Sequence, residues 1–218
     1  MTEFVVRGTA SHIFAAESVT VPLAAEFEDS KSVVAHEKAV ALQSELIAAV
    51  RDLEAAGGVA RWTSDRVHSH SYHPTDRDGR VQPAVHHTSI GLSVEFTDFD
   101  VLAPFMDAWG ARDGVQLGTL HWDVLRDNRI DYEDELRIAA VHDAMRKAQA
   151  YADAVGAGAV RALVIADSGM MSAGAEPSHG PVPRFALAAS AGAPALEIQS
   201  SGVEIRVSVD GRFEAGTR

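Results

Sequence analysis

Cysteine is absent from this sequence, which excludes disulfides, thiolate catalysis and cysteine-ligated zinc or iron–sulfur centres. No uninterrupted apolar run approaches the length of a membrane-spanning helix, so we expect no membrane insertion. Basic residues are outnumbered by acidic ones, 19 against 31, and the arginines are scattered singly. The resulting net charge of −12 repels nucleic acid and anionic membranes, and we expect neither as a partner.

The rest of the composition is that of a globular protein. With 218 residues, 46% of them hydrophobic and 23% charged, the chain can bury the core of one large domain or two small ones. Its first residues, MTEFVVRGTASHIF, include the acidic Glu3 and no long apolar segment of the kind found in secretory signals. Together with the lack of cysteine, this predicts a cytoplasmic location.

Hydrophobic periodicity predicts the element order β-β-α-β-β-α-β-α-β-β. The fold class is therefore α+β, with antiparallel or mixed sheets built from strand–strand–helix units, helices on one face and a projecting β-hairpin. We expect one unit over 1–218, or two interleaved lobes of about 1–97 with 196–213 and about 98–168, and a flexible linker over 169–194. The expected strands cover about 3–12, 17–28, 61–72, 81–96, 115–124, 160–166 and 202–213, and the expected helices end near 56, 111 and 155.

The last expected helix carries alanine at every fourth position. The run AAVHDAMRKAQAYADAVG, followed by VRALVIAD, places these small residues on one helix face and closes the helix with Gly156. Together with Asp143, Arg146 and Lys147, this run resembles the C-terminal signature of the SIMPL-domain family. The similarity extends over roughly Val5 to Val209, and the alanines of the face are Ala140, Ala144, Ala148 and Ala152.

The SIMPL resemblance implies an oligomer-forming α+β fold of poorly defined function, with no catalytic residues to transfer. One local departure is Ala16-Glu17, which stands where family members often have a Pro-Asp pair. The resemblance therefore carries expectations of fold and self-association. It gives no expectation of a catalysed reaction.

A histidine-rich hairpin is the main candidate for chemistry. If the chain turns at 76–79, paired residue numbers sum to about 155, and His87 lies opposite His68, which shares a strand face with His70. Three imidazoles could then converge on zinc, nickel or copper, with His68, His70 and His87 as ligands. The alternative is a solvated polar hairpin, and we favour it because the sequence indicates no carboxylate second shell for these histidines. No cofactor is expected.

Other polar and aromatic groups have structural interpretations. Acidic side chains near the start of the last helix suit its positive end, and the tryptophans with Phe105 suit a core or a subunit interface. The acidic residues are Asp131, Glu133, Asp134 and Glu135, and the tryptophans are Trp62, Trp109 and Trp122.

The sequence thus predicts a protein that is not an enzyme and acts through self-association or by binding a protein partner. We expect a homo-oligomer, because the hairpin arm from Val67 to His73 is too polar for its own core and leaves a strand edge that a second subunit could cover. Two alternatives are a metal-binding protein or metal-dependent enzyme that uses the histidine hairpin, and an adaptor that captures a protein through Met170-Met171.

Overall fold

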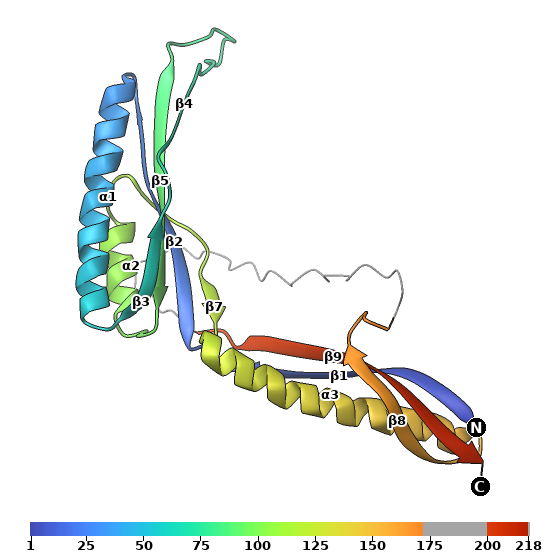
Figure 1. Ribbon diagram of the computed structural model, residues 1–218. Helices are drawn as coiled ribbons and strands as arrows, with labels where there is room; N and C mark the ends of the chain where they lie inside the picture. Colours follow the sequence, from blue (N-terminus) through green and yellow to red (C-terminus); the bar gives the residue numbers. More distant parts are fainter. Residues whose placement is uncertain (172–199, 218) are drawn as a thin grey trace. The chain divides into compact units, whose positions relative to one another are not determined.

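A computed structural model describes residues 1–171 and 200–217 as an α+β protein with three helices and antiparallel strands (Figure 1). The predicted fold class is confirmed. None of the helices in this part of the chain combines the length and apolarity needed to cross a bilayer. The expected linker over 169–194 lies outside the described residues from 172 onward.

The described residues form two compact units. The first unit holds residues 1–15, 124–171 and 202–217, and the second holds 16–123 with 200–201. This division differs from the lobes expected from the sequence, because the first strand belongs with the last helix and not with the strand that follows it. Each unit has a sheet of its own.

The second unit contains a six-stranded antiparallel sheet. Its central strands are β2 (Ser18–Asp29) and β5 (Val85–Phe96), in the strand order β3-β5-β2-β6. The other strands are short: β3 (Val59–Ser64) and β4 (His68–Tyr72) pair with β5, and β6 (Val115–Leu117) and β7 (His121–Asp123) pair with β2. Both helices, α1 (Ser32–Ala55) and α2 (Leu102–Gly110), cover one face of this sheet (Figure 1).

Alternation along the central strands builds the core of the second unit. Every second residue of β2 from Val19 to Ala25 is buried, and the same holds for β5 from Ile90 to Phe96. Against them pack the helical stripe Leu42, Leu46 and Val50 and the α2 residues Phe105 and Trp109. Trp62 and Trp122 are half-buried and pack against this cluster, so of the two roles expected for the tryptophans, core or subunit interface, the structure shows contact with the core.

Pro22 explains why the predicted strand 115–124 is two strands. Proline has no N–H to donate, and Pro22 lies where the pairing of β2 changes from β6 to β7. There the Gly118 N–H donates to the Pro22 carbonyl at 2.7 Å. A methyl group on Gly118 would come within 2.7 Å of the proline ring, so the interruption needs glycine.

The first unit has a three-stranded antiparallel sheet in the order β1-β9-β8. Its strands are β1 (Thr2–Phe14), β8 (Ala157–Asp167) and β9 (Val203–Thr217), and α3 (Arg126–Ala154) runs along one face (Figure 1). All four alanines of the predicted face are fully buried in or beside this interface: Ala140, Ala144, Ala148 and Ala152.

The start of α3 corrects one interpretation. The helix begins at Arg126, five residues before Asp131, and its first turn holds Asp127 as the acidic residue. The acidic run from Asp131 to Glu135, which the sequence suggested for the N-terminal turn, lies in later turns. Two of its members instead pair with Arg137, at 3.1 Å for Glu133 and 2.5 Å for Asp134.

Candidate functional site

The histidine hairpin forms, with a register that differs from the predicted one. His70 lies opposite His87, and His68 lies opposite Ser89, so paired numbers sum to 157 and not 155. The turn at 76–79 is present, with the Gly79 N–H donating to the Asp76 carbonyl. Between Thr75↔Val81 and Tyr72↔Val85 the returning arm has an extra residue, and this shifts the register. The predicted pairing of His87 with His68 is wrong.

His87 has neighbours on both adjacent strands. Its ring lies 4.6 Å from the ring of His70 on β4, centroid to centroid, and its Nε2 contacts a carboxylate oxygen of Glu26 on β2. The Nδ1 atom of His87 is buried without a hydrogen-bond partner in the structure. Two residues along β2, Glu28 accepts a hydrogen bond from the Tyr72 hydroxyl at 3.1 Å, which raises the pKa of Tyr72.

Glu26 and Glu28 are the members of this face that sequence reasoning missed. They belong to a strand about sixty residues earlier, and only the β2–β5 pairing brings them to the hairpin. A cross-strand partner of this kind leaves no local spacing signal. Within the described residues, no group of three or more His, Asp or Glu side chains is placed to hold a metal ion. The three-histidine convergence that the metal hypothesis needs is not assembled.

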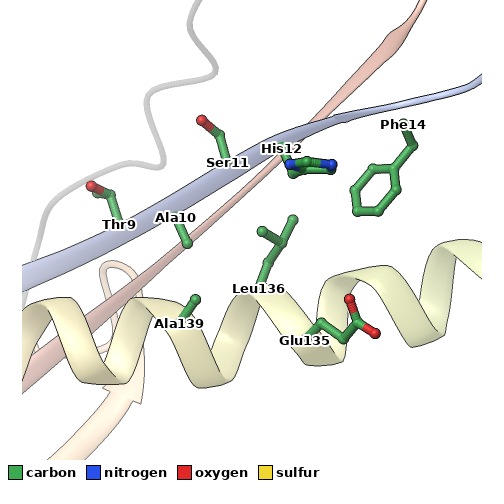
Figure 2. Close-up of a pocket in the computed structure, with 8 residues that line it drawn as sticks. All are labelled: Thr9, Ala10, Ser11, His12, Phe14, Glu135, Leu136 and Ala139. Atoms are coloured by element: carbon green, nitrogen blue, oxygen red, sulfur yellow. The ribbon is translucent and has the colours of Figure 1, made fainter.

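A shallow hollow lies in the first unit between β1 and α3 (Figure 2). Leu136 and Ala139 form its helical wall. In the strand, Ala10 points toward the helix, whereas the hydroxyl groups of Thr9 and Ser11 point away from it (Figure 2). The hydroxyl groups of Thr9 and Ser11 therefore do not point into the hollow, and a small-molecule site needs several polar groups that converge. The remaining lining residues are His12, Phe14 and Glu135.

The same two elements are joined by polar contacts further along. Asp143 of α3 accepts the Thr9 N–H at 3.0 Å, and Lys147 donates to the Arg7 carbonyl at 2.9 Å. Asp143 is buried and also pairs with Lys147 at 2.6 Å and with Arg146. Mainly the Lys147 bond, and then the Thr9 N–H, lowers the pKa of Asp143. These contacts give backbone groups of β1, an end strand, partners on α3 in place of a further strand.

The other end strand, β8, is held by α3 only where it begins. The Gln149 side chain accepts the Val160 N–H at 3.0 Å and donates to the Gly158 carbonyl at 3.4 Å. From Arg161 onward, the strand has β9 on one side and no hydrogen-bonded strand on the other within the described residues. Its apolar side chains are nevertheless well exposed: Leu163 by 38%, Val164 by 44% and Ile165 by 41%.

The sheet face turned away from α3 carries two ion pairs. Arg7 of β1 binds the buried Asp210 at 2.7 Å, and Arg161 of β8 binds the buried Glu214. The Arg7 guanidinium, with a smaller effect of the Gly169 N–H at 2.8 Å, lowers the pKa of Asp210 despite its burial. Both acceptors lie on the central strand β9 and both arginines on its neighbours, so these pairs tie the three strands together.

These features coincide with the family signature. A family model described as "SIMPL: Protein of unknown function (DUF541)" matches residues 4–213, nearly the whole chain. The chain belongs to the SIMPL family. A search of curated proteins finds no match. In this SIMPL protein, the alanine face and the Asp143–Lys147 pair together join α3 to β1, which explains in physical terms why these residues occur together.

Proposed function

We propose that this SIMPL protein has a non-catalytic role and acts by self-association, and that its subunits join through the outer edge of β8. The observation that carries the proposal is the difference between the two ends of the three-stranded sheet. One end strand, β1, has backbone partners on α3 at Arg7 and Thr9. The other, β8, is apolar, exposed and unpaired along its outer side within the described residues.

An exposed apolar edge is what soluble proteins normally avoid. Sheet edges are blunted by charge, by proline or by a covering element, because unpaired N–H and C=O groups invite another strand. The segment Ala162–Ala166 has no charged residue and no proline. Its large side chains keep about two fifths of their surface in solvent. A second strand would pair the backbone and remove this apolar surface from water.

The edge of the histidine hairpin is the competing surface, and it suits the role less well. All residues of β4 are exposed, but four of the five are Ser or His, and the fifth, Tyr72, is already bound to Glu28. Pairing along β4 would bury polar side chains and would remove less apolar surface from water than pairing along β8. The prediction that the hairpin arm mediates assembly therefore stays a prediction, and the β8 edge is the surface we favour.

Light scattering behind a sizing column tests self-association directly. We expect a mass of at least twice the 23.2 kDa of one chain, falling on dilution as the subunits separate. Shortening residues 74–82 to a tight turn serves as the control for the hairpin. It should leave the number of chains in the assembly unchanged. A mass of 23.2 kDa at every concentration would contradict the proposal. Loss of the oligomer on shortening the hairpin would transfer the role to β4.

A further inference from the structure

His70 and His87 stand side by side on adjacent strands, on the sheet face turned away from α1 and α2. They are directly paired across β4 and β5, and their ring centroids are 4.6 Å apart with the ring planes inclined by 38°. Two imidazoles that bind one metal ion at about 2.0–2.1 Å, at right angles or tetrahedrally, have centroids about 4.5–5 Å apart. The strand pairing therefore already holds the two rings at the separation of two ligands of one ion.

The hydrogen bonding of His87 leaves one of its nitrogens suited to a metal. A carboxylate can only accept a hydrogen bond, so the Nε2 atom that contacts Glu26 carries the proton. In the neutral ring, Nδ1 is then an unprotonated lone pair, and it is buried without a hydrogen-bond partner in the described part of the chain. A buried polar atom without a partner costs free energy unless a water or an ion takes it.

Glu26 gives His87 the carboxylate that metal-binding histidines normally have. A histidine that ligates a metal almost always donates its other ring N–H to a carboxylate or a carbonyl group, which fixes the ring and strengthens the ligand. Glu26 reaches His87 through the pairing of β2 with β5, and the side chains are only 34% and 15% exposed, respectively. The lack of such a carboxylate in the sequence was the reason to favour a solvated hairpin, and the structure supplies one.

We propose that His70 and His87 together bind one divalent transition-metal ion, copper most tightly, with Glu26 holding the His87 ring in place. The protein gives two ligands and water completes the coordination, which agrees with the lack of any group of three metal-binding side chains within the described residues. The exposed His70 ring must turn so that one nitrogen faces Nδ1 of His87, and exposed side chains change rotamer freely. His68, which lies opposite Ser89, has no part.

The choice of copper follows from the ligands. Imidazole suits copper, nickel and zinc, and for a given set of ligands the affinity of divalent ions rises to a maximum at copper. Zinc sites in proteins have three or four protein ligands, whereas this pair offers two. The bound ion would join β4 to β5, in addition to the Ser69–Thr88 hydroxyl contact at 3.1 Å. Since the ion binds only the folded hairpin, it should also stabilise it.

Calorimetric titration of untagged protein with copper, nickel or zinc chloride tests the proposal. We expect one copper ion per chain, bound more tightly than nickel or zinc. His70→Ala should weaken copper binding by about tenfold or more, as loss of a ligand does. His68→Ala is the matched control, because His68 is also an exposed histidine of β4, and it should bind copper as the wild type does. Equal affinities for His70→Ala and the wild type would overturn the proposal.

His87→Gln separates the paired site from copper held by β4 and its flanking residues alone. The segment HSHSYHP has three histidines of its own, and an ion bound by them would not need β5. We expect His87→Gln to lose tight copper binding. Glu26→Gln keeps an acceptor for the His87 N–H but removes the charge, and it should weaken copper binding about tenfold while the metal-free protein melts as the wild type does. Unchanged copper affinity in His87→Gln would overturn the site.

Two further readouts cover a variant that fails to fold. The electron paramagnetic resonance spectrum of the copper-loaded wild type should show coupling to two histidine nitrogens, and coupling to one or none would overturn the proposal. Copper should raise the melting temperature of the wild type and of His68→Ala but not that of His70→Ala, whose exposed position makes misfolding an unsuitable explanation. A wild-type protein that binds no copper would overturn the proposal, and self-association would stand unaffected.

Discussion

A methyl group on Gly8 would come within 1.9 Å of the carbonyl oxygen of Ala140, far closer than atoms can approach. Strand β1 and helix α3 therefore touch backbone to backbone at this point, and the buried Ala144 lies beside the contact, 2.9 Å from the same methyl position. The alanine face of α3 exists because larger side chains would hold the helix away from the strand. With this approach, Asp143 and Lys147 can reach the β1 backbone.

Gly8→Ala should destabilise the first unit strongly. The new methyl group meets backbone atoms, which cannot rotate away, so α3 must move off β1 and lose its contacts there. Overpacking of this kind costs about 1–3 kcal/mol or more. Thermal unfolding measures the loss, and Gly216→Ala in β9 is the matched control, because nothing lies within 4 Å of its added methyl group. Equal melting temperatures for the two variants would show that the helix is not packed as described.

Ala148→Leu should also destabilise the protein, by about 1–3 kcal/mol. Ala148 is fully buried in the cluster formed by α3, β1 and β9, and a leucine would need space that the close packing does not leave. Chemical denaturation measures the free energy of unfolding. Ile138→Leu, at a helix position that is 62% exposed, controls for the helix itself and should change stability little. A stable Ala148→Leu variant would mean that the alanine face is loosely packed.

The stabilisation that Asp143 provides should depend on pH with a defined sign. Its pKa is lowered in the folded protein, mainly by Lys147, so the ionised form is favoured by folding. The contribution is present in full well above the ordinary aspartate pKa of about 3.9 and is lost as pH falls through the lower folded value. Asp143→Asn should therefore lower the melting temperature at neutral pH.

That difference between wild type and Asp143→Asn should shrink below about pH 4, where wild-type Asp143 starts to bind a proton in the unfolded chain. Melts of both proteins across the acid range provide the measurement. A difference that stays constant with pH would mean that the carboxylate charge has no part in holding α3 to β1.

Replacing His68 and His70 together by alanine should leave stability within about 0.5 kcal/mol of wild type, because both side chains are exposed. Denaturant unfolding of untagged protein checks this. Metal analysis of the same samples tests the metal hypothesis. Stoichiometric zinc, nickel or copper in the wild type that disappears in the double variant would show that the hairpin binds metal, by a rearrangement that the present geometry does not contain.

Local patterns predicted the elements well, and they failed where distant segments meet. The alanine face, the helix end at Gly156 and the alternation in β2 follow from spacing alone, and the structure has all three. The hairpin register was missed by two positions, because the turn between Thr75 and Val81 is one residue longer than predicted and the returning arm has an extra residue between Val81 and Val85. Neither can be seen in the alternation of side chains. Asp143 stood in a recognised signature, but its partner Thr9 is 134 residues away in sequence.

The exposure of β8 could not have been predicted either. A short apolar run flanked by glycine and a turn is typical of a strand buried on both faces, and the sequence of β8 fits that description. Only the strand order shows that β8 is an end strand, with its large side chains in solvent. The contradiction between an interior-like sequence and a peripheral position is the reason to expect a partner there.

The most direct test of self-association through β8 compares Val164→Lys with Val5→Lys by sedimentation velocity. Both residues are exposed and both pair with Arg212 of β9, one on each end strand, so the two lysines perturb the same face of the same sheet. A lysine within an edge strand disfavours pairing with another chain. We expect Val164→Lys to sediment as a folded monomer of 23.2 kDa and Val5→Lys to remain associated like the wild type. Equal sedimentation of the two variants, associated or monomeric, would contradict the account.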